Sequence, residues 1–375
     1  MASTEDALFA LLTAALVAWA TVPVAEWLAR RVGAIDEPRP RSLHATATPR
    51  ISGLAILAGI EVSGWIWLPT SEPWTVILLG AVAVGLVGAL DDIFELSAPV
   101  KFAGQVVTAS IPVAFAAVYP EVVTIPFLGG IELGWTAYPL TVIGIVAVMN
   151  IVNLIDGIDG LAAGVCLIAG LALAAIALSL DRIDAGILAA LTAGGAAGFL
   201  IHGFPPASSF MGDAGSNLLG YLLAIASIQG ALKTNAVVAL AFPLVILAVP
   251  ILDTAFVVAK RIKYRQPIYQ ADRWHFHHRF ANLGFSQRKT LAYLYGWTAV
   301  LALLALALRF VPYSDDRGNF DPLWTAIMAA VILLAVVASV YLAVVLEIVK
   351  RRSPREAADG PSGDDPERDR DGTGT

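Results

Sequence analysis

Long apolar runs recur along most of the chain and decide what it can fold into. Lipid offers the backbone no hydrogen-bond partners, so a spanning segment is either a helix of about 20 mostly apolar residues or a strand of a closed barrel. Barrel strands alternate apolar and polar residues, and these runs do not. About eleven runs are long enough for a spanning helix. They cover residues 7–28, 51–68, 74–90, 99–118, 136–152, 160–178, 183–201, 216–231, 237–259, 290–309 and 323–347.

Composition and charge agree with a membrane protein. Because 58% of residues are hydrophobic and only 14% are charged, we predict an all-α, polytopic integral membrane protein. Lys and Arg accumulate in cytoplasmic loops, and with the N-terminus outside, the cytoplasmic segments hold 20 of the 24 Lys and Arg residues. We therefore expect a cytoplasmic C-terminus. Residues 1–350 are expected to form one transmembrane domain, and the acidic residues 351–375 a disordered cytoplasmic tail.

Polar residues near the ends of these runs gather on the predicted cytoplasmic side. Charge placed at membrane depth costs on the order of a few kcal/mol or more, so such residues are functional candidates. Helix capping is the simpler explanation for any single Asp at a helix end. The lone Cys166 lies within a run, which leaves neither a disulfide framework nor a cysteine zinc site. The candidates are Asp91, Asp92, Asn150, Asn153, Asp156, Asp159, Asp213, Asp253, His275, His277 and His278.

The stretch NIVNLIDGIDGLAAG, residues 150–164, carries four of these candidates at intervals of three. On a helix, neighbours at that spacing share a face. Gly157 and Gly160 predict that the helix opens here and lets the backbone approach a ligand. A calcium loop is a weak alternative, because Ile158 stands where an oxygen ligand is required. Hydrogen bonding between helices is an equally good explanation for Asn150.

The stretch FMGDAGSN, residues 210–217, predicts a helix start beside a ligand. Ser216 can cap the following helix, whose free N–H groups could hold a phosphate. Asp213 could hold a cation beside that phosphate. Mg²⁺ takes a few carboxylates plus phosphate oxygens and waters, and further carboxylates are available from Asp91, Asp92 and Asp156. A capped turn alone would explain the Gly and Ser residues but not Asp213.

The loop QPIYQADRWHFHHRF, residues 266–280, offers Arg273, three His residues and Arg279. Three His could bind zinc, but no carboxylate or Cys accompanies them at the usual spacing. Phosphate binding is the favoured interpretation, because the Arg guanidinium group matches the geometry of phosphate oxygens and a neighbouring His can donate hydrogen bonds.

Several motifs, in order and on one side, resemble the polyprenyl-phosphate N-acetylhexosamine-1-phosphate transferases. The motifs are DDIFEL at 91, KFAGQ at 101, NIVNLIDGIDGLAAG at 150, FMGDAGS at 210, PILDT at 250 and DRWHFHH at 272. Members move a phosphosugar from a UDP-sugar to a lipid phosphate. The HFHH pattern and PILDT resemble the branch that uses UDP-N-acetylglucosamine. The APIHHHFE loop of the phospho-N-acetylmuramoyl-pentapeptide transferases is absent, but that activity is kept as an alternative.

The resemblance implies roles residue by residue. Asp213 is the expected principal Mg²⁺ ligand, with Asp156 as a second ligand and Mn²⁺ as an alternative ion. Asp91, Asp92 and Lys101 are expected beside the lipid phosphate, and Asp91, Asp92, Asp156 and Asp213 are the expected catalytic residues. The expected substrate contacts are Arg50, Lys101, Asn153, Asp159, Phe210, Arg273, His275, His277 and His278, with Phe210 stacking on uracil.

Two positions depart from the family pattern. Ser52 stands where the family commonly has the first of two Gly residues, which affects a close approach. Gly203 stands where the family usually has Asn, so a nucleotide contact is either lost or supplied by His202.

The expected reaction is attack of a polyprenyl phosphate oxygen on the sugar-linked phosphorus, with UMP leaving. The phosphate monoester has a second pKa of about 6, so its oxygen is largely ionised at neutral pH and needs no strong base. An aspartyl-phosphate route ranks below direct attack. The partners are a UDP-sugar and polyprenyl phosphate, with no nucleic acid and with a homodimer left open, at the cytoplasmic face of a prokaryotic plasma membrane. The alternative from another class is a cation-coupled transporter, although its polar groups would lie near the midplane.

Overall fold

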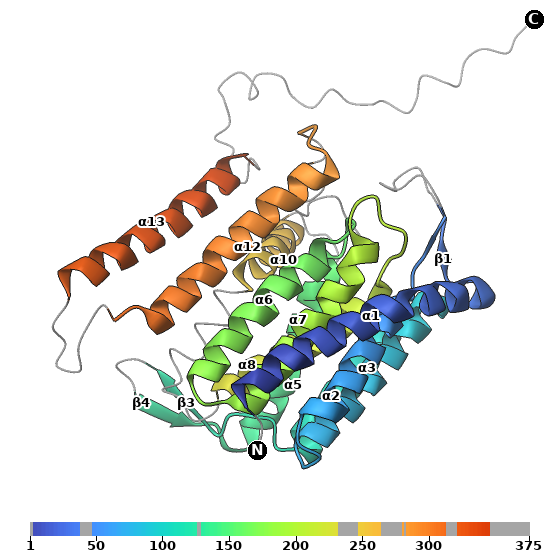
Figure 1. Cartoon of the computed structure of the whole chain (residues 1–375), viewed down its shortest axis with the longest axis horizontal. Coiled ribbons are helices and arrows are strands. Elements are labelled where there is room, and N and C mark those ends of the chain that lie inside the picture. Colours follow the sequence, from blue (N-terminus) through green and yellow to red (C-terminus); the bar gives the residue numbers. More distant parts are fainter. Residues whose placement is uncertain are drawn as a thin grey trace, which may run out of the picture.

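The structure is a computed structural model that describes residues 3–37, 47–125, 129–231, 247–263, 280, 283–312 and 321–345. Its described part is a bundle of long helices (Figure 1). Each helix overlaps one of the predicted apolar runs. The helices are α1 Thr4–Val32, α2 Gly53–Trp67, α3 Trp74–Phe94, α4 Ala98–Phe115, α5 Ala137–Ile155, α6 Leu161–Ser179, α7 Ile183–Gly203, α8 Gly212–Ala231, α10 Ala248–Lys263, α12 Gln287–Phe310 and α13 Pro322–Val345.

Eight helical segments in the described residues are long and apolar enough to cross a membrane. They are α1, α3, α4, α6, α7, α12, α13 and the segment Gly134–Ile155, which joins a short 3-10 turn to α5. The apolar α2 is shorter, at 15 residues. The prediction of a polytopic helical membrane protein is confirmed. The number of eleven spans, the orientation of the termini and the two-part division of the chain stay predictions.

Local sequence explains how α1 begins and ends. Ser3 and Asp6 form a capping box, in which the Ser3 N–H donates to Asp6 Oδ2 at 2.6 Å and the Asp6 N–H donates to Ser3 Oγ. Gly33 ends the helix in the left-handed region at φ +78°, which glycine adopts without a Cβ clash.

Two short antiparallel hairpins lie outside the bundle. Strand β1 Ile35–Asp36 pairs with β2 Thr48–Pro49, and β3 Val122–Ile125 pairs with β4 Gly129–Glu132. Figure 1 places β1 beside the C-terminal end of α1 and the β3–β4 hairpin at the other end of the bundle. Candidates that the structure describes, such as Asp92, Asp156 and Asp213, lie at the β1 end, near Asp36.

Helix α8 forms the centre of the bundle, where it packs against α2, α3, α5, α6 and α7. Its residues 214–226 are buried, and the Tyr221 side chain is fully buried. By contrast, α13 packs along α12 and presents exposed apolar side chains such as Leu333, as expected of a lipid-facing helix. Small residues allow the close approaches, because a Cβ at Gly194 or Gly198 would overlap the α1 backbone.

Candidate active site

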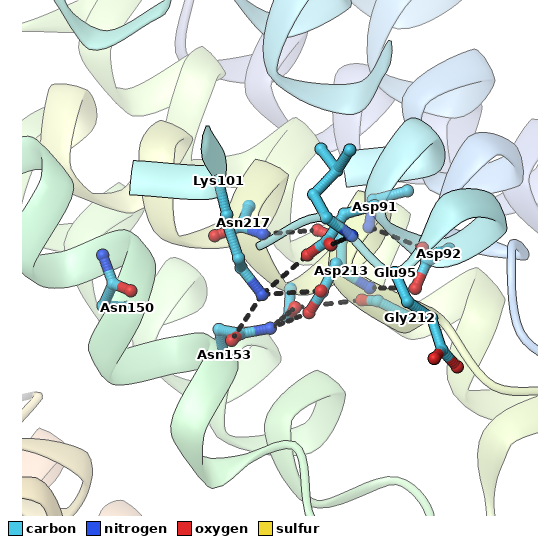
Figure 2. A network of polar contacts seen from close by, with 12 residues as sticks. Asp91, Asp92, Glu95, Lys101, Asn150, Asn153, Gly212, Asp213 and Asn217 are labelled. Atoms are coloured by element: carbon cyan, nitrogen blue, oxygen red, sulfur yellow. Dashed lines mark hydrogen bonds and ion pairs between the residues drawn. The ribbon is translucent and has the colours of Figure 1, made fainter. Parts of the chain in front are cut away.

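Charged side chains from three helices meet at Lys101, near the start of α4. Lys101 Nζ lies 2.9 Å from Asp91 Oδ2 of α3 and 2.6 Å from Asp213 Oδ2 of α8. It also donates to Asn153 Oδ1 of α5 at 3.4 Å. Figure 2 shows these side chains pointing toward one another. We call Asp91, Lys101, Asn153 and Asp213 the lysine node.

Both carboxylate oxygens of Asp213 are engaged in this node. Lys101 binds Oδ2, and the Asn153 amide donates to Oδ1. The same amide nitrogen of Asn153 donates to Ser216 Oγ at 2.9 Å. Four segments that are distant in sequence therefore converge on one carboxylate, as the sequence motifs predicted without indicating the pairs.

Asp92 caps α8 from a different helix. Its two carboxylate oxygens accept the backbone N–H groups of Asp213 at 2.9 Å and Ala214 at 3.0 Å. Ser216, predicted to be the cap, instead lies one turn inside α8 and donates to the Gly212 carbonyl at 2.9 Å. The predicted capping role of Ser216 is wrong, and two of the N–H groups expected to hold a phosphate are occupied by Asp92.

Close backbone contacts hold the start of α8 in place. A Cβ on Gly53 of α2 would overlap the backbone of Gly215, and a Cβ on Gly212 would overlap the Arg50 carbonyl. Gly212 also has φ +64°. Backbone hydrogen bonds join the two segments, because the Phe210 N–H donates to the Pro49 carbonyl at 2.8 Å and the Ser52 N–H to the Phe210 carbonyl at 3.1 Å. Segments 49–53 and 210–212 are thus held together by backbone hydrogen bonds and close backbone contacts.

The Arg50 side chain connects these two joined segments to the end of α3. Its Nε donates to the Asp92 carbonyl at 2.7 Å, and its Nη2 lies 3.4 Å from Glu95 Oε1. Glu95 is an exposed partner, so this ion pair leaves the guanidinium accessible to an anionic ligand.

The helix opens between α5 and α6 as predicted. Helix α5 ends at Ile155, α6 begins at Leu161, and Gly160 has φ +76°. Because α5 ends before Asp156, the predicted helical face does not extend to Asp159. Asp159 Oδ2 instead accepts the N–H of Ala207 at 3.1 Å, which ties this loop to the segment after α7.

A cavity of about 430 Å³ adjoins the lysine node. Its lining includes most of the predicted site residues in the described part of the chain: Arg50, Asp92, Asn153, Asp156, Asp159, Phe210 and Asp213. Lys101 and Asp91 border a separate small cavity of about 10 Å³. Lys101 and Asp91 therefore contact Asp213 from a part of the site that does not line the large cavity.

Gln287 is a cavity residue that sequence reasoning missed. It stands at the first position of α12 and lines the large cavity. Its Nε2 is buried and has no hydrogen-bond partner within the described residues. A Gln at the start of a helix is common, so nothing in the local sequence distinguished it.

Asp156 faces a strongly negative environment. Burial raises the pKa of its carboxyl well above the usual range, and the nearby carboxylates Asp213, Asp92 and Asp159 raise it further. Since the carboxylates in this region outnumber the cations Lys101 and Arg50, a diphosphate would need additional positive charge to bind here.

The residues fit a metal ion whose coordination shell is completed by phosphate oxygens. Across the described ranges, no three acidic or His side chains are grouped closely enough to hold a metal by themselves. Mg²⁺ nevertheless commonly uses one or two carboxylates and completes its shell with phosphate oxygens and waters. Asp156 and Asp213 line the same cavity and supply carboxylates of that kind.

The structure describes both positions that depart from the family pattern. The buried hydroxyls of Ser52 and Ser209 hydrogen-bond to each other, so the extra side chain at position 52 is accommodated. Gly203 lines the large cavity, whereas His202 is not among its lining residues. A nucleotide contact from His202 in place of the family Asn stays a prediction.

Four predicted substrate contacts lie outside the described residues. They are Arg273, His275, His277 and His278, and their roles stay predictions.

Comparisons with known proteins identify the family. The description "Glycosyl transferase family 4" matches residues 74–231. A probable undecaprenyl-phosphate N-acetylglucosaminyl 1-phosphate transferase of Bacillus subtilis is 35% identical over 81% of this chain and 87% of its own length. A decaprenyl-phosphate N-acetylglucosaminephosphotransferase of Mycobacterium tuberculosis is 34% identical over 89% of this chain and 88% of its own. A phospho-N-acetylmuramoyl-pentapeptide-transferase of Desulforudis audaxviator is 33% identical over 71% and 86%.

The matched region contains the whole lysine node, and the B. subtilis and M. tuberculosis relatives extend over most of the bundle. This chain is therefore a membrane-embedded member of glycosyl transferase family 4.

Proposed function

We propose that this chain transfers N-acetylglucosamine 1-phosphate from UDP-N-acetylglucosamine to a polyprenyl phosphate such as undecaprenyl phosphate, and releases UMP. The observation that carries the proposal is the lysine node itself. A cation and a carboxylate meet beside a polar cavity at one end of a membrane bundle. A water-soluble donor and a lipid acceptor can both reach such a place.

The surroundings of Asp213 suggest a division of labour. Lys101 and Asp91, which do not line the large cavity, bind and orient the acceptor phosphate. Arg50 and Phe210, which line it, bind the nucleotide. Asp213 and Asp156 would hold Mg²⁺, which when bound supplies positive charge to the diphosphate. The largely ionised acceptor oxygen then attacks the sugar-linked phosphorus directly, and UMP leaves with the electron pair of the broken phosphoanhydride bond.

Asp92 is a positioning residue in this proposal. Both of its oxygens bind the α8 backbone, so Asp91, which contacts Lys101, is the better placed of the two acids to touch the acceptor. The distribution of Lys and Arg supports a cytoplasmic location for this end of the bundle.

Two observations favour the simpler amino sugar over N-acetylmuramoyl-pentapeptide as the donor group. The M. tuberculosis relative named for N-acetylglucosamine covers 89% of the chain and the B. subtilis relative is 35% identical to it, whereas pentapeptide transferases cover 70–81% of it at 31–33% identity. The chain also carries HFHH, residues 275–278, instead of an APIHHHFE loop.

Release of UMP tests the proposal. Purified protein in detergent is given undecaprenyl phosphate, Mg²⁺ and either UDP-N-acetylglucosamine or UDP-N-acetylmuramoyl-pentapeptide. We expect lipid-dependent release with the first donor alone. Release with the second donor alone would transfer the proposal to the pentapeptide branch, and folded protein inactive with both would reject it.

A pH-dependent stability test addresses Asp156. Its raised pKa means that the folded protein binds a proton more tightly than the unfolded chain does. The contribution of Asp156 to wild-type stability should therefore fall as pH rises from the ordinary carboxyl pKa of about 3.9 toward the raised value. We expect Asp156→Asn to raise the melting temperature without metal or nucleotide, by an amount that grows across this interval. A shift that is the same at every pH would contradict the expectation.

A further inference from the structure

A second, uncharged network lies next to the lysine node. Asn150 of α5 donates from Nδ2 to Gln105 Oε1 at 2.8 Å, and Gln105 of α4 donates from Nε2 to Asn217 Oδ1 at 2.8 Å. Asn217 of α8 donates from Nδ2 to the Asp213 carbonyl at 2.8 Å. We call Gln105, Asn150 and Asn217 the amide clasp. The hydrogen bonding between helices considered for Asn150 is thus confirmed.

The amide clasp repeats the lysine node one helical turn deeper in the bundle. Gln105 follows Lys101 by four residues on α4, and Asn217 follows Asp213 by four residues on α8. Asn150 precedes Asn153 by three residues on α5. Residues three or four apart share a helix face, so each clasp residue stands directly beside one node residue. Figure 2 shows Asn150 to the left of the charged side chains, on the same helix as Asn153.

Only one orientation of the Gln105 amide satisfies its hydrogen bonds to Asn150 and Asn217. Turning the Gln105 amide over would place its NH₂ against the NH₂ of Asn150 and its carbonyl against the carbonyl of Asn217. Gln105 is 2% exposed and Asn217 is 3% exposed, so water does not replace a lost partner. An unpaired buried amide is costly. Sliding or rotation of α4, α5 or α8 would therefore break at least one bond.

We propose that Gln105 is a positioning residue for phosphosugar transfer. It holds α4, α5 and α8 in the register that brings Lys101 and Asn153 onto the Asp213 carboxylate. Gln105 does not line the large cavity. It borders the small cavity of about 10 Å³, but both ends of its amide are engaged by Asn150 and Asn217, so it acts on the reaction through these neighbours. A misplacement of about 1 Å can reduce a rate about 100-fold. The inference rests on the proposed transferase function.

Gln105→Met tests this role with a side chain of similar length that cannot form the clasp. We expect kcat to fall about 10- to 100-fold, with the KM for UDP-N-acetylglucosamine changed by less than about threefold. The matched control is Thr108→Val. Thr108 is also buried on α4, but its hydroxyl donates only to the α4 carbonyls of Gly104 and Gln105. The control should retain wild-type kcat.

A double-mutant cycle separates positioning from folding. If Asn150 and Gln105 act as one unit, the kcat of Asn150→Leu combined with Gln105→Met should be no lower than that of Gln105→Met alone. All rates are measured per folded protein, by size-exclusion chromatography and thermal unfolding. If Gln105→Met does not fold, the triple variant that combines Gln105→Met with Asn150→Leu and Asn217→Leu replaces it, because it leaves no clasp amide unpaired.

The outcomes are distinct. Wild-type kcat in folded Gln105→Met or in the triple variant overturns the inference, as does an equal loss in Thr108→Val. A low kcat in the folded variants supports it. Absence of UMP release from the wild-type protein would instead reject the proposed function on which the inference rests.

Discussion

Asp213→Asn is expected to lower lipid-dependent UMP release at least about 1000-fold while the protein stays folded. The substitution keeps the shape of the side chain but removes the negative charge that pairs with Lys101 at 2.6 Å. It also removes the carboxylate proposed to bind Mg²⁺ at the diphosphate. Loss of a single preorganised electrostatic group costs about 100- to 1000-fold in other enzymes, and here two such contacts are lost together.

Asp321→Asn is the matched control for Asp213→Asn. Asp321 also stands at a helix N-terminus, where its Oδ1 accepts the N–H groups of Leu323 at 2.9 Å and Trp324 at 3.0 Å. An Asn side chain can keep this cap, so activity should stay within about twofold of wild type. Initial rates at saturating substrate are compared for both variants. More than about a tenth of wild-type activity in Asp213→Asn would remove Asp213 from its proposed catalytic role.

The helices could be predicted from the sequence because lipid imposes a length and a composition on each of them. Every predicted run overlaps a described helix, including α2 and α8. The hairpins β1–β2 and β3–β4 were not predicted. Their strands contain two and four residues, and segments that short depend on the partner strand more than on their own residues.

The members of the site were predictable, but their pairing was not. Local motifs marked Asp91, Lys101, Asn153 and Asp213, which the structure brings together. The cap of α8 was mispredicted because local reasoning considers only nearby side chains. Asp92 reaches the same N–H groups from α3, and only the packing of α3 against α8 makes that contact available.

Gln105 shows the same limit in another form. The motif KFAGQ drew attention to its position but assigned Gln105 no role. Its importance lies in partners 45 and 112 residues away in sequence. A polar residue on an apolar helix predicts some buried partner, and only the three-dimensional arrangement identifies Asn150 and Asn217.

Gly88→Ala is expected to produce a large loss of stability, because it adds a methyl group against the backbone of a neighbouring helix. Gly88 of α3 faces the first turn of α8, where a Cβ would lie 2.5 Å from the Ala214 Cα and 2.6 Å from the Asp213 carbonyl oxygen. Backbone atoms cannot turn away as the end of a flexible side chain can. Overpacking of this kind typically costs about 1–3 kcal/mol, and we expect Gly88→Ala to lie at or above the upper end.

Gly144→Ala is the matched control, because Gly144 also lies inside a membrane-spanning helix but a Cβ there would meet no atom within 4 Å among the described residues. Replacing this glycine should stabilise α5 by up to about 1 kcal/mol through helix propensity. Thermal unfolding in detergent compares the two variants.

The position of Gly88 adds a functional consequence. A shift of α8 away from α3 would pull the Asp213 and Ala214 N–H groups from Asp92, and it would pull the Asp213 carboxylate from Lys101. Gly88→Ala should therefore lose UMP release even where it remains folded, and equal melting temperatures and rates for the two variants would mean that α3 and α8 are not in the close contact on which the active site depends.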